Sequence, residues 1–303
     1  MPIDPSVAVG AELPEVTFSW SASDVALYHL AVGAAADPVD AAGLAYVDDV
    51  APKVLPGFAT VAETFHTVAA PAVRFPGIEI DLAKVVHGSQ QVTPCGPLPA
   101  SGTATARTRI VEVQDKGSAA VIIAEKTVVD VDDRPLWTAR SSIFAKGEGG
   151  FGGERGTSTR VSYPDRAPDH VLSVATRPNQ ALLYRLCGDR NPLHSDPGFA
   201  AAAGFPRPIL HGLCTYGMVC RALVDELLDG QVTHVTDYSA TFAGVVFPGE
   251  TLAITVWVEP DRLLATATVA ERDGAPALGN VIVATTSTPP VPVRGVGSRR
   301  LSS

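Results

Sequence analysis

Residues 180–229 read QALLYRLCGDRNPLHSDPGFAAAAGFPRPILHGLCTYGMVCRALVDELLD, and this stretch decides the fold. It predicts a short apolar helix stopped by Gly188, a second short helix over 197–203 and a long helix from 211–212 to about 229. Pro192 cannot lie inside a helix, and it pushes Asn191 toward extended geometry. Asp189 and His194 therefore lie on a bent loop, where both side chains can converge on one small molecule.

The long helix is apolar in every direction until the acidic residues near its end, so we expect it to be buried and wrapped by a sheet. Its first turn has unpaired backbone N–H groups and the positive end of the helix dipole. Gly212 has no side chain, so a ligand oxygen can approach that backbone closely. An acid/base pair beside such a terminus suits a reaction that forms an enolate-like oxyanion.

Alternating and β-branched segments separated by turn residues predict strands in both halves of the chain. The expected strands are 85–92, 102–114, 119–131 and 136–145, then 170–176, 233–246, 251–258, 263–271 and 278–285. Residues 16–33 predict a capped amphipathic helix, 34–49 a loop, and 58–67 a buried helix of the first half. The glycine-rich segment 147–156 is expected to be a flexible linker rather than a phosphate loop, because no helix pattern follows it.

Composition excludes several classes of protein. The 303 residues have 46% hydrophobic and 18% charged content, which is normal for a globular protein. The net charge of −9 argues against nucleic-acid binding. We expect no membrane span, no secretory signal and no peroxisomal address at the ending Leu-Ser-Ser. The four cysteines and seven histidines show no zinc-type spacing, so we expect no metal and a reducing cytoplasm.

The motif YRLCGDRNPLH at 184–194, followed by ILHG at 209–212, resembles the signature of the MaoC-like 2-enoyl-CoA hydratase 2 family. The resemblance implies an α+β double hot-dog fold, in which two long helices are each wrapped by an antiparallel sheet. It also implies syn hydration of trans-2-enoyl-CoA to (3R)-3-hydroxyacyl-CoA, in fatty-acid or steroid side-chain oxidation. By the same analogy, we expect an acyl-CoA substrate, no separate cofactor and a homodimer.

The resemblance covers roughly residues 16–285. It predicts a first domain over 1–150, a second domain over 151–288 and a disordered tail over 289–303. The first half has no Gly-Asp-x-Asn-Pro-x-His motif, so one catalytic centre per chain is expected. In the family, the first domain shapes the acyl pocket.

Asp189 and His194 are the predicted catalytic pair, because a carboxylate and an imidazole that share one water can remove and return a proton. Which of them is the base stays open. The alternative is that the aspartate caps Asn191 and the histidine binds a loop carbonyl. The family implies that Asn191 holds the water, although it could also form an Asx turn, and that the Gly212 N–H binds the oxyanion.

The remaining site residues are substrate contacts implied by the resemblance. They are His87, Gly88, Lys116, Arg190, Pro192, Leu193 and Phe242. A lysine suits the phosphates of coenzyme A, but Lys116 could equally be a solvated turn residue. Phe242 could be a core residue, and His87 with Gly88 could be a strand kink.

Two other functions stay open: a hot-dog acyl-CoA thioesterase and a non-catalytic acyl-CoA-binding subunit. The motif favours hydration over thioester hydrolysis, and the intact acid/base pair argues against a non-catalytic role. Small residues at 31–45 and 57–72 leave room for a long, branched or steroid-type chain, without deciding among them.

Overall fold

The computed structural model describes residues 3–69, 75–80, 85–157 and 160–286. The predicted disordered tail lies outside these residues. The described chain forms ten strands and a few helices, which confirms the α+β class. The strands are β1 (Val16–Trp20), β2 (Val85–Pro94), β3 (Gly102–Asp115), β4 (Ala119–Asp130), β5 (Pro135–Lys146), β6 (His170–Ala175), β7 (Val235–Phe242), β8 (Thr251–Glu259), β9 (Arg262–Val269) and β10 (Ala275–Thr285).

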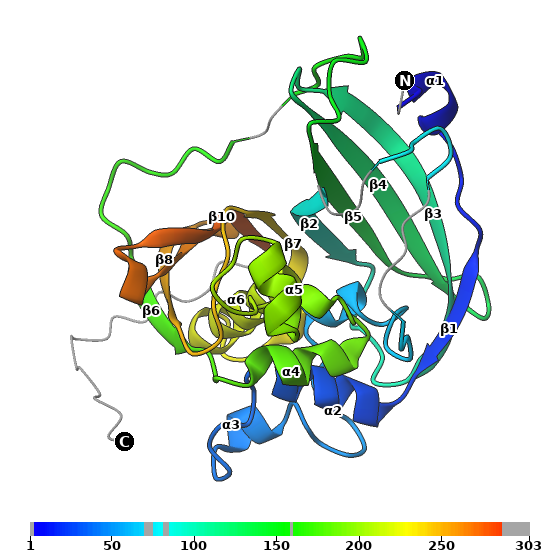
Figure 1. The fold of residues 1–303 in the computed structure, drawn as a ribbon. Coiled ribbons are helices and arrows are strands. Elements are labelled where there is room, and N and C mark those ends of the chain that lie inside the picture. Colours follow the sequence, from blue (N-terminus) through cyan, green and yellow to red (C-terminus); the bar gives the residue numbers. More distant parts are fainter. Residues whose placement is uncertain (1–2, 70–74, 81–84, 158–159, 287–303) are drawn as a thin grey trace.

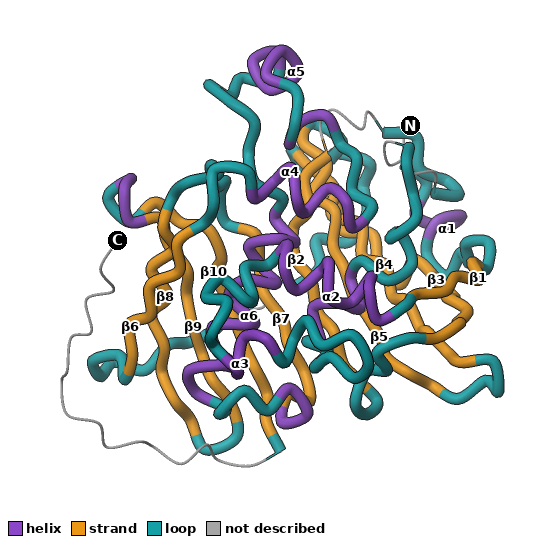
Figure 2. The backbone as a smooth tube through the Cα atoms, turned by 90° about the horizontal axis from the view of Figure 1, so that it is seen from below, coloured by secondary structure: helices purple, strands orange, loops and turns teal. Residues whose placement is uncertain are grey.

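All ten strands join in one antiparallel sheet with the order β1-β3-β4-β5-β2-β7-β10-β9-β8-β6. Figure 2 shows the strands of the two halves side by side in one row. The halves meet where β2 pairs with β7 over four positions, from Ser89 opposite Thr241 to Val92 opposite Tyr238. The first half therefore extends the sheet of the second half.

The helices are α1 (Pro5–Ala8), α2 (Ala22–Ala31), α3 (Ala41–Leu44), α4 (Gln180–Tyr184), α5 (Pro197–Ala202) and α6 (Gly212–Leu227). The predicted long helix is confirmed as α6, whose residues are mostly buried. In Figure 1, α6 lies within the curve of the strands of the second half, as the apolar pattern requires. Among the described residues, no helix is long and apolar enough to cross a membrane.

Three predictions for the first half need correction. Residues 34–49, expected to form a loop, contain the short helix α3, which the Asp40 side chain caps. The helix expected over 58–67 is a 3₁₀ turn over Pro56–Thr60 followed by further turns. The Thr60 and Thr64 hydroxyls donate to the carbonyls of Gly57 and Val61, which offers the backbone an alternative to a regular helix. Residues 16–33 hold strand β1 before the capped helix α2, whose Ser21–Asp24 capping box is confirmed.

The glycine-rich segment is anchored rather than flexible. The Asp115 carboxylate accepts hydrogen bonds from the N–H groups of Gly150 and Gly152, both at 2.8 Å, and from Gly117 in its own turn. These N–H groups hold the pKa of Asp115 below its usual value. The segment that leads into the second half is thus tied to the β3–β4 turn.

Candidate active site

The predicted catalytic loop begins at a glycine that no other residue can replace without rearrangement. Helix α4 continues as a 3₁₀ turn and stops at Gly188, whose φ is 107°. A Cβ at Gly188 would lie 1.9 Å from the Thr64 carbonyl oxygen of the first half. The loop that follows is therefore packed directly on the first half.

Asp189 and Asn191 fold the loop through their own side chains. The Asp189 carboxylate accepts the Asn191 N–H at 3.1 Å, and the Asn191 side-chain oxygen accepts the Leu193 N–H at 3.0 Å. The two structural roles considered for these residues, the Asp189 cap on Asn191 and the Asx turn of Asn191, are therefore both present. They use one oxygen of each side chain, so the second Asp189 oxygen and the Asn191 NH₂ group remain available for chemistry.

His194 ends the loop in a defined tautomer. Its Nδ1 lies 2.9 Å from the Ile209 carbonyl oxygen, which can only accept, so Nδ1 carries the proton. Burial lowers the pKa of His194, with 8% of the residue exposed. The neutral ring therefore has its lone pair at Nε2, where it can accept a proton.

His211 was not predicted as a site residue, yet it joins the parts of the site. It precedes the first residue of α6 and is 1% exposed. Its ring stacks on that of His194, with centroids 3.7 Å apart and planes at 28°. Its Nε2 lies 3.3 Å from the Asp189 carbonyl oxygen. The only sequence signal for His211 was the His-Gly pair at the start of the long helix. That pair directed the prediction to Gly212 and not to the histidine.

Residues of both halves meet at Gly212. A Cβ at Gly212 would lie 2.9 Å from Phe242 Cδ1, and the Phe242 ring lies 4.6 Å from that of His87. His87 is only half-buried as a residue, but its Nε2 is shielded and has no partner among the described residues. Burial lowers the pKa of His87 to about 4, and the charge of Asp189 opposes this shift. These three predicted residues therefore lie beside the catalytic loop.

Three potential metal ligands converge in this site. Asp189, His194 and His211 each offer a donor atom, and these atoms lie within 4.8 Å of one another. Each lone pair lies in the plane of its imidazole ring, and the two rings are stacked with their planes only 28° apart, so these planes do not cross at the bonding distance of one ion. The arrangement therefore suits hydrogen bonding better than metal ligation, and the absence of a metal stays a prediction.

The other loop residues predicted to touch substrate hold the loop in place. The Leu193 carbonyl accepts the Ile209 N–H at 3.3 Å, and Pro192 opens the 3₁₀ turn that ends at His194. Arg190 is half-exposed and its Nε points to the Thr67 carbonyl oxygen at 3.5 Å. Their substrate contacts stay predictions.

Gly88 and Lys116 lie elsewhere, on a groove of about 900 Å³ that β2, β3, β4, β5, β7 and β10 line. The segment after the glycine-rich stretch contributes Arg160, and β5 contributes Arg140. Lys116 is half-buried, and its Nζ donates to the Arg155 carbonyl oxygen at 2.6 Å. The groove thus holds three cationic side chains and the carboxylate of Glu112, which lies 3.7 Å from Arg140.

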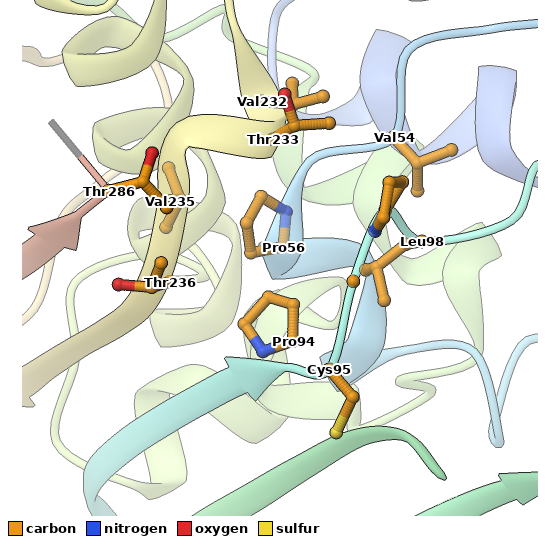
Figure 3. Close-up of a pocket in the computed structure, with 12 residues that line it drawn as sticks. Val54, Pro56, Pro94, Cys95, Leu98, Val232, Thr233, Val235, Thr236 and Thr286 are labelled. Atoms are coloured by element: carbon orange, nitrogen blue, oxygen red, sulfur yellow. The ribbon is translucent and has the colours of Figure 1, made fainter. Parts of the chain in front are cut away.

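A second pocket, of about 230 Å³, lies at the other end of β2 from His87 (Figure 3). Of its described lining residues, none is acidic or a histidine; they include Pro56, Pro94, Cys95 and Val232. Its described lining thus provides no carboxylate or imidazole, and it is not the candidate active site.

Comparison with known proteins agrees with this geometry. Residues 18–147 match the MFE-2 hydratase 2 N-terminal domain, and residues 160–275 match the MaoC like domain. Enoyl-CoA hydratase ChsH3 of Mycobacterium tuberculosis is 56% identical over 281 residues, which are 93% of this chain and 98% of that protein. This chain belongs to the MaoC-like hydratase 2 family.

Solved structures support the same family fold. The MaoC-like dehydratase of Phytophthora capsici is 29% identical, with a TM-score of 0.84 over 94% of this chain and 99% of its own. Rv0216 of Mycobacterium tuberculosis, described as a double hot-dog fold, has a TM-score of 0.56 over 91% of this chain and 95% of its own, at 17% identity. The predicted double hot-dog class is confirmed. The expectation of two long helices needs correction, because the longest helix among the described residues of the first half is α2, with 10 residues.

Proposed function

We propose that this chain is an (R)-specific enoyl-CoA hydratase that adds water reversibly to trans-2-enoyl-CoA. The observation that carries the proposal is the meeting of three groups at one place. The Asp189 carboxylate and the His194 imidazole lie on a loop whose backbone is bonded to His211, and Gly212 follows at the start of α6. The family relative ChsH3 is named an enoyl-CoA hydratase.

The reaction needs a water between two hydrogen-bond acceptors. The free oxygen of Asp189 and the Nε2 of His194 each accept from the water, while the Asn191 NH₂ group donates to its oxygen. One acceptor removes a proton as the oxygen attacks C3. The electrons move to the thioester oxygen, and the Gly212 N–H at the positive end of α6 stabilises that oxyanion. A proton then returns to C2, so the elements of one water are added.

The stereochemistry follows from one loop serving both steps. Because Asp189 and His194 lie on the same loop, the O–H and C–H bonds form on the same face of the enoyl group. The addition is therefore syn. The (3R) product rests on the family resemblance, since it depends on which face the substrate presents.

The groove provides a path for coenzyme A. Pairing of β2 with β7 stops at Ser89 and Thr241, and Gly88 forms a bulge at the same point. His87 and Phe242 lie just past this end of the seam, beside the catalytic loop. We place the thioester at this opening and the phosphates beside Lys116, where local cations compensate for the acidic protein.

The division of labour follows the family. Residues 1–150 shape the acyl pocket, and residues 151–288 carry the chemistry. The small residues at 31–45 and 57–72 leave room for a long or branched acyl chain, and fatty-acid or steroid side-chain oxidation fits such a substrate. Of 57–72, the last three residues lie outside the described chain.

Assembly, compartment and cofactor belong to the same proposal. Family analogy supports a homodimer. The cysteines at 187, 214 and 220 are buried free thiols, which supports a reducing cytoplasm. The acid/base pair and the helix terminus supply each step above without a separate cofactor.

The decisive experiment follows the ultraviolet absorbance of the enoyl thioester, with short, long and ring-bearing substrates. Hydration removes the absorbance without releasing a thiol. Running the reaction in deuterated water and analysing the product by chiral chromatography and NMR then gives the face of addition. Release of free thiol would identify a thioesterase, no turnover would indicate a binding subunit, and a (3S) product would reject the hydratase 2 assignment.

A further inference from the structure

His211 occupies the junction between the acid/base loop and the start of α6. It is the residue before Gly212, yet its side chain does not cap the helix. The ring turns instead toward the loop, where it lies 4.9 Å from the ring of Tyr184 and stacks on His194. A histidine buried here needs an explanation, because a serine would cap the helix start and would not place an imidazole ring in the interior.

The hydrogen bond of His211 fixes its protonation state. The Asp189 carbonyl oxygen only accepts, so His211 Nε2 carries the proton and donates at 3.3 Å. Burial, followed by the proximity of His194, lowers the pKa of His211 to about 2. The ring is therefore neutral wherever the enzyme is folded and active, and it does not exchange protons with the substrate.

The two contacts of His211 reach the two halves of the acid/base pair. Its Nε2–H holds the main chain of Asp189, and its ring supports the imidazole of His194. Its own main chain leads directly into Gly212. One side chain thus links the loop that holds the carboxylate and the imidazole to the segment that holds the oxyanion donor.

We propose that His211 is a positioning residue that sets the separation between the acid/base pair and the Gly212 N–H. This inference rests on the proposed hydration reaction. Substrate binding depends on the contacts with the acyl chain and coenzyme A. The transition state depends on the correct distances among the Asp189 carboxylate, the His194 imidazole and the Gly212 N–H. A displacement of about 1 Å at such a site can cost about a hundredfold in rate. Loss of His211 should therefore lower kcat and leave KM nearly unchanged.

Two substitutions separate the hydrogen bond from the shape of the ring. His211→Gln keeps an amide donor near the position of Nε2, whereas His211→Phe keeps a planar ring without a donor. We expect kcat to fall about tenfold to a hundredfold in the Phe variant, with KM within about threefold. The Gln variant should retain at least about five times the kcat of the Phe variant, since the Asp189 carbonyl keeps its donor.

His29 provides the matched control. It is also a buried neutral histidine, and its Nε2 accepts the Leu55 N–H at 3.2 Å, away from the catalytic loop. His29→Phe should lower the melting temperature at least as much as His211→Phe and change kcat by less than about twofold. If His211→Phe does not fold, His211→Asn replaces it, because the shorter amide cannot reach the Asp189 carbonyl.

Each outcome decides the proposal. A kcat for folded His211→Phe or His211→Asn equal to that of the wild type would overturn it, as would a Gln variant no better than the donor-free variants. A rise in KM at constant kcat would make His211 a binding residue instead. Failure of the hydratase proposal is seen separately, because the wild-type protein itself would then show no hydration.

Discussion

The ring of Phe242 lies against Gly212 so closely that a Cβ on the glycine would be 2.9 Å from Phe242 Cδ1. A residue from the last position of β7 thus covers the start of α6. The contact leaves no room for a side chain at position 212. Residue 212 is glycine because a side chain would not fit. Its backbone conformation is ordinary helix and does not itself require glycine.

Gly212→Ala should therefore lower kcat by at least about tenfold, because the new methyl group displaces the Phe242 ring and moves the proposed oxyanion donor. The double variant Gly212→Ala/Phe242→Leu should recover part of that loss. Steady-state kinetics on both variants, beside Phe242→Leu alone, measure the coupling. An Ala variant with normal kcat would remove Gly212 from the mechanism.

Asp189→Asn and His194→Ala should each lower the hydration rate by orders of magnitude without unfolding the protein, since each group acts in the transition state. The double variant should be little worse than either single variant, because the two groups act as a unit. Asparagine keeps the acceptor for the Asn191 N–H, so the loop fold is preserved. Near-normal turnover in either single variant would end the assignment.

Lys116→Glu should raise KM and leave kcat largely intact, because the coenzyme A phosphates are remote from the reacting carbons. Added salt should reduce the effect, as for any exposed charge pair. Lys53→Glu gives the same change of net charge beside the Tyr46 ring, outside the groove, and should leave KM unchanged. Equal KM values for the two variants at low ionic strength would make Lys116 an ordinary turn residue.

Stability should fall in acid because of buried neutral histidines. Burial lowers the pKa of His29 to about 3, of His87 to about 4 and of His211 to about 2, and also lowers that of His194. The unfolded chain takes up protons below about pH 6.5, whereas the folded chain does not, so each histidine costs up to about 1.4 kcal/mol per pH unit below that value. Denaturant unfolding between pH 8 and 4 measures this slope.

His29→Gln tests the origin of the acid sensitivity. Glutamine can still accept the Leu55 N–H, and it does not titrate. The slope of unfolding free energy against pH should therefore fall by the equivalent of about one proton between pH 6 and 4. An unchanged slope would mean that His29 is protonated in the folded chain.

Removal of metal should have no effect on hydration. A chelator with long equilibration should leave kcat and the melting temperature unchanged, because the stacked His194 and His211 rings do not aim their lone pairs at one ion. Loss of activity that zinc restores would show that Asp189, His194 and His211 act as ligands.

Local chemistry explains which predictions succeeded. The loop from Gly188 to His194 contains its own turn signals, and the structure has the bend that Gly188 and Pro192 predict. Helix α6 was predictable because no arrangement other than burial suits its apolar surface. The antiparallel strands followed from short turns between alternating segments.

Long-range contacts explain the failures. His211 acquires its importance from the rings of His194 and Tyr184, 17 and 27 residues earlier, and a local sequence pattern does not reveal such contacts. The 58–67 segment buries the same apolar positions as a helix would, but its threonine hydroxyls bond to its own backbone. The anchoring of the glycine-rich segment depends on Asp115, some thirty-five residues earlier.

The pairing of β2 with β7 affects how readily the newly made chain aggregates. Divided at the glycine-rich segment, the chain would expose each of these strands as an edge, and open edges are templates for aggregation. Covalent fusion keeps the two edges at high effective concentration, so that pairing within one molecule precedes pairing between molecules. The half without the acid/base motif thus covers, through β2, a strand edge that the other half would leave open.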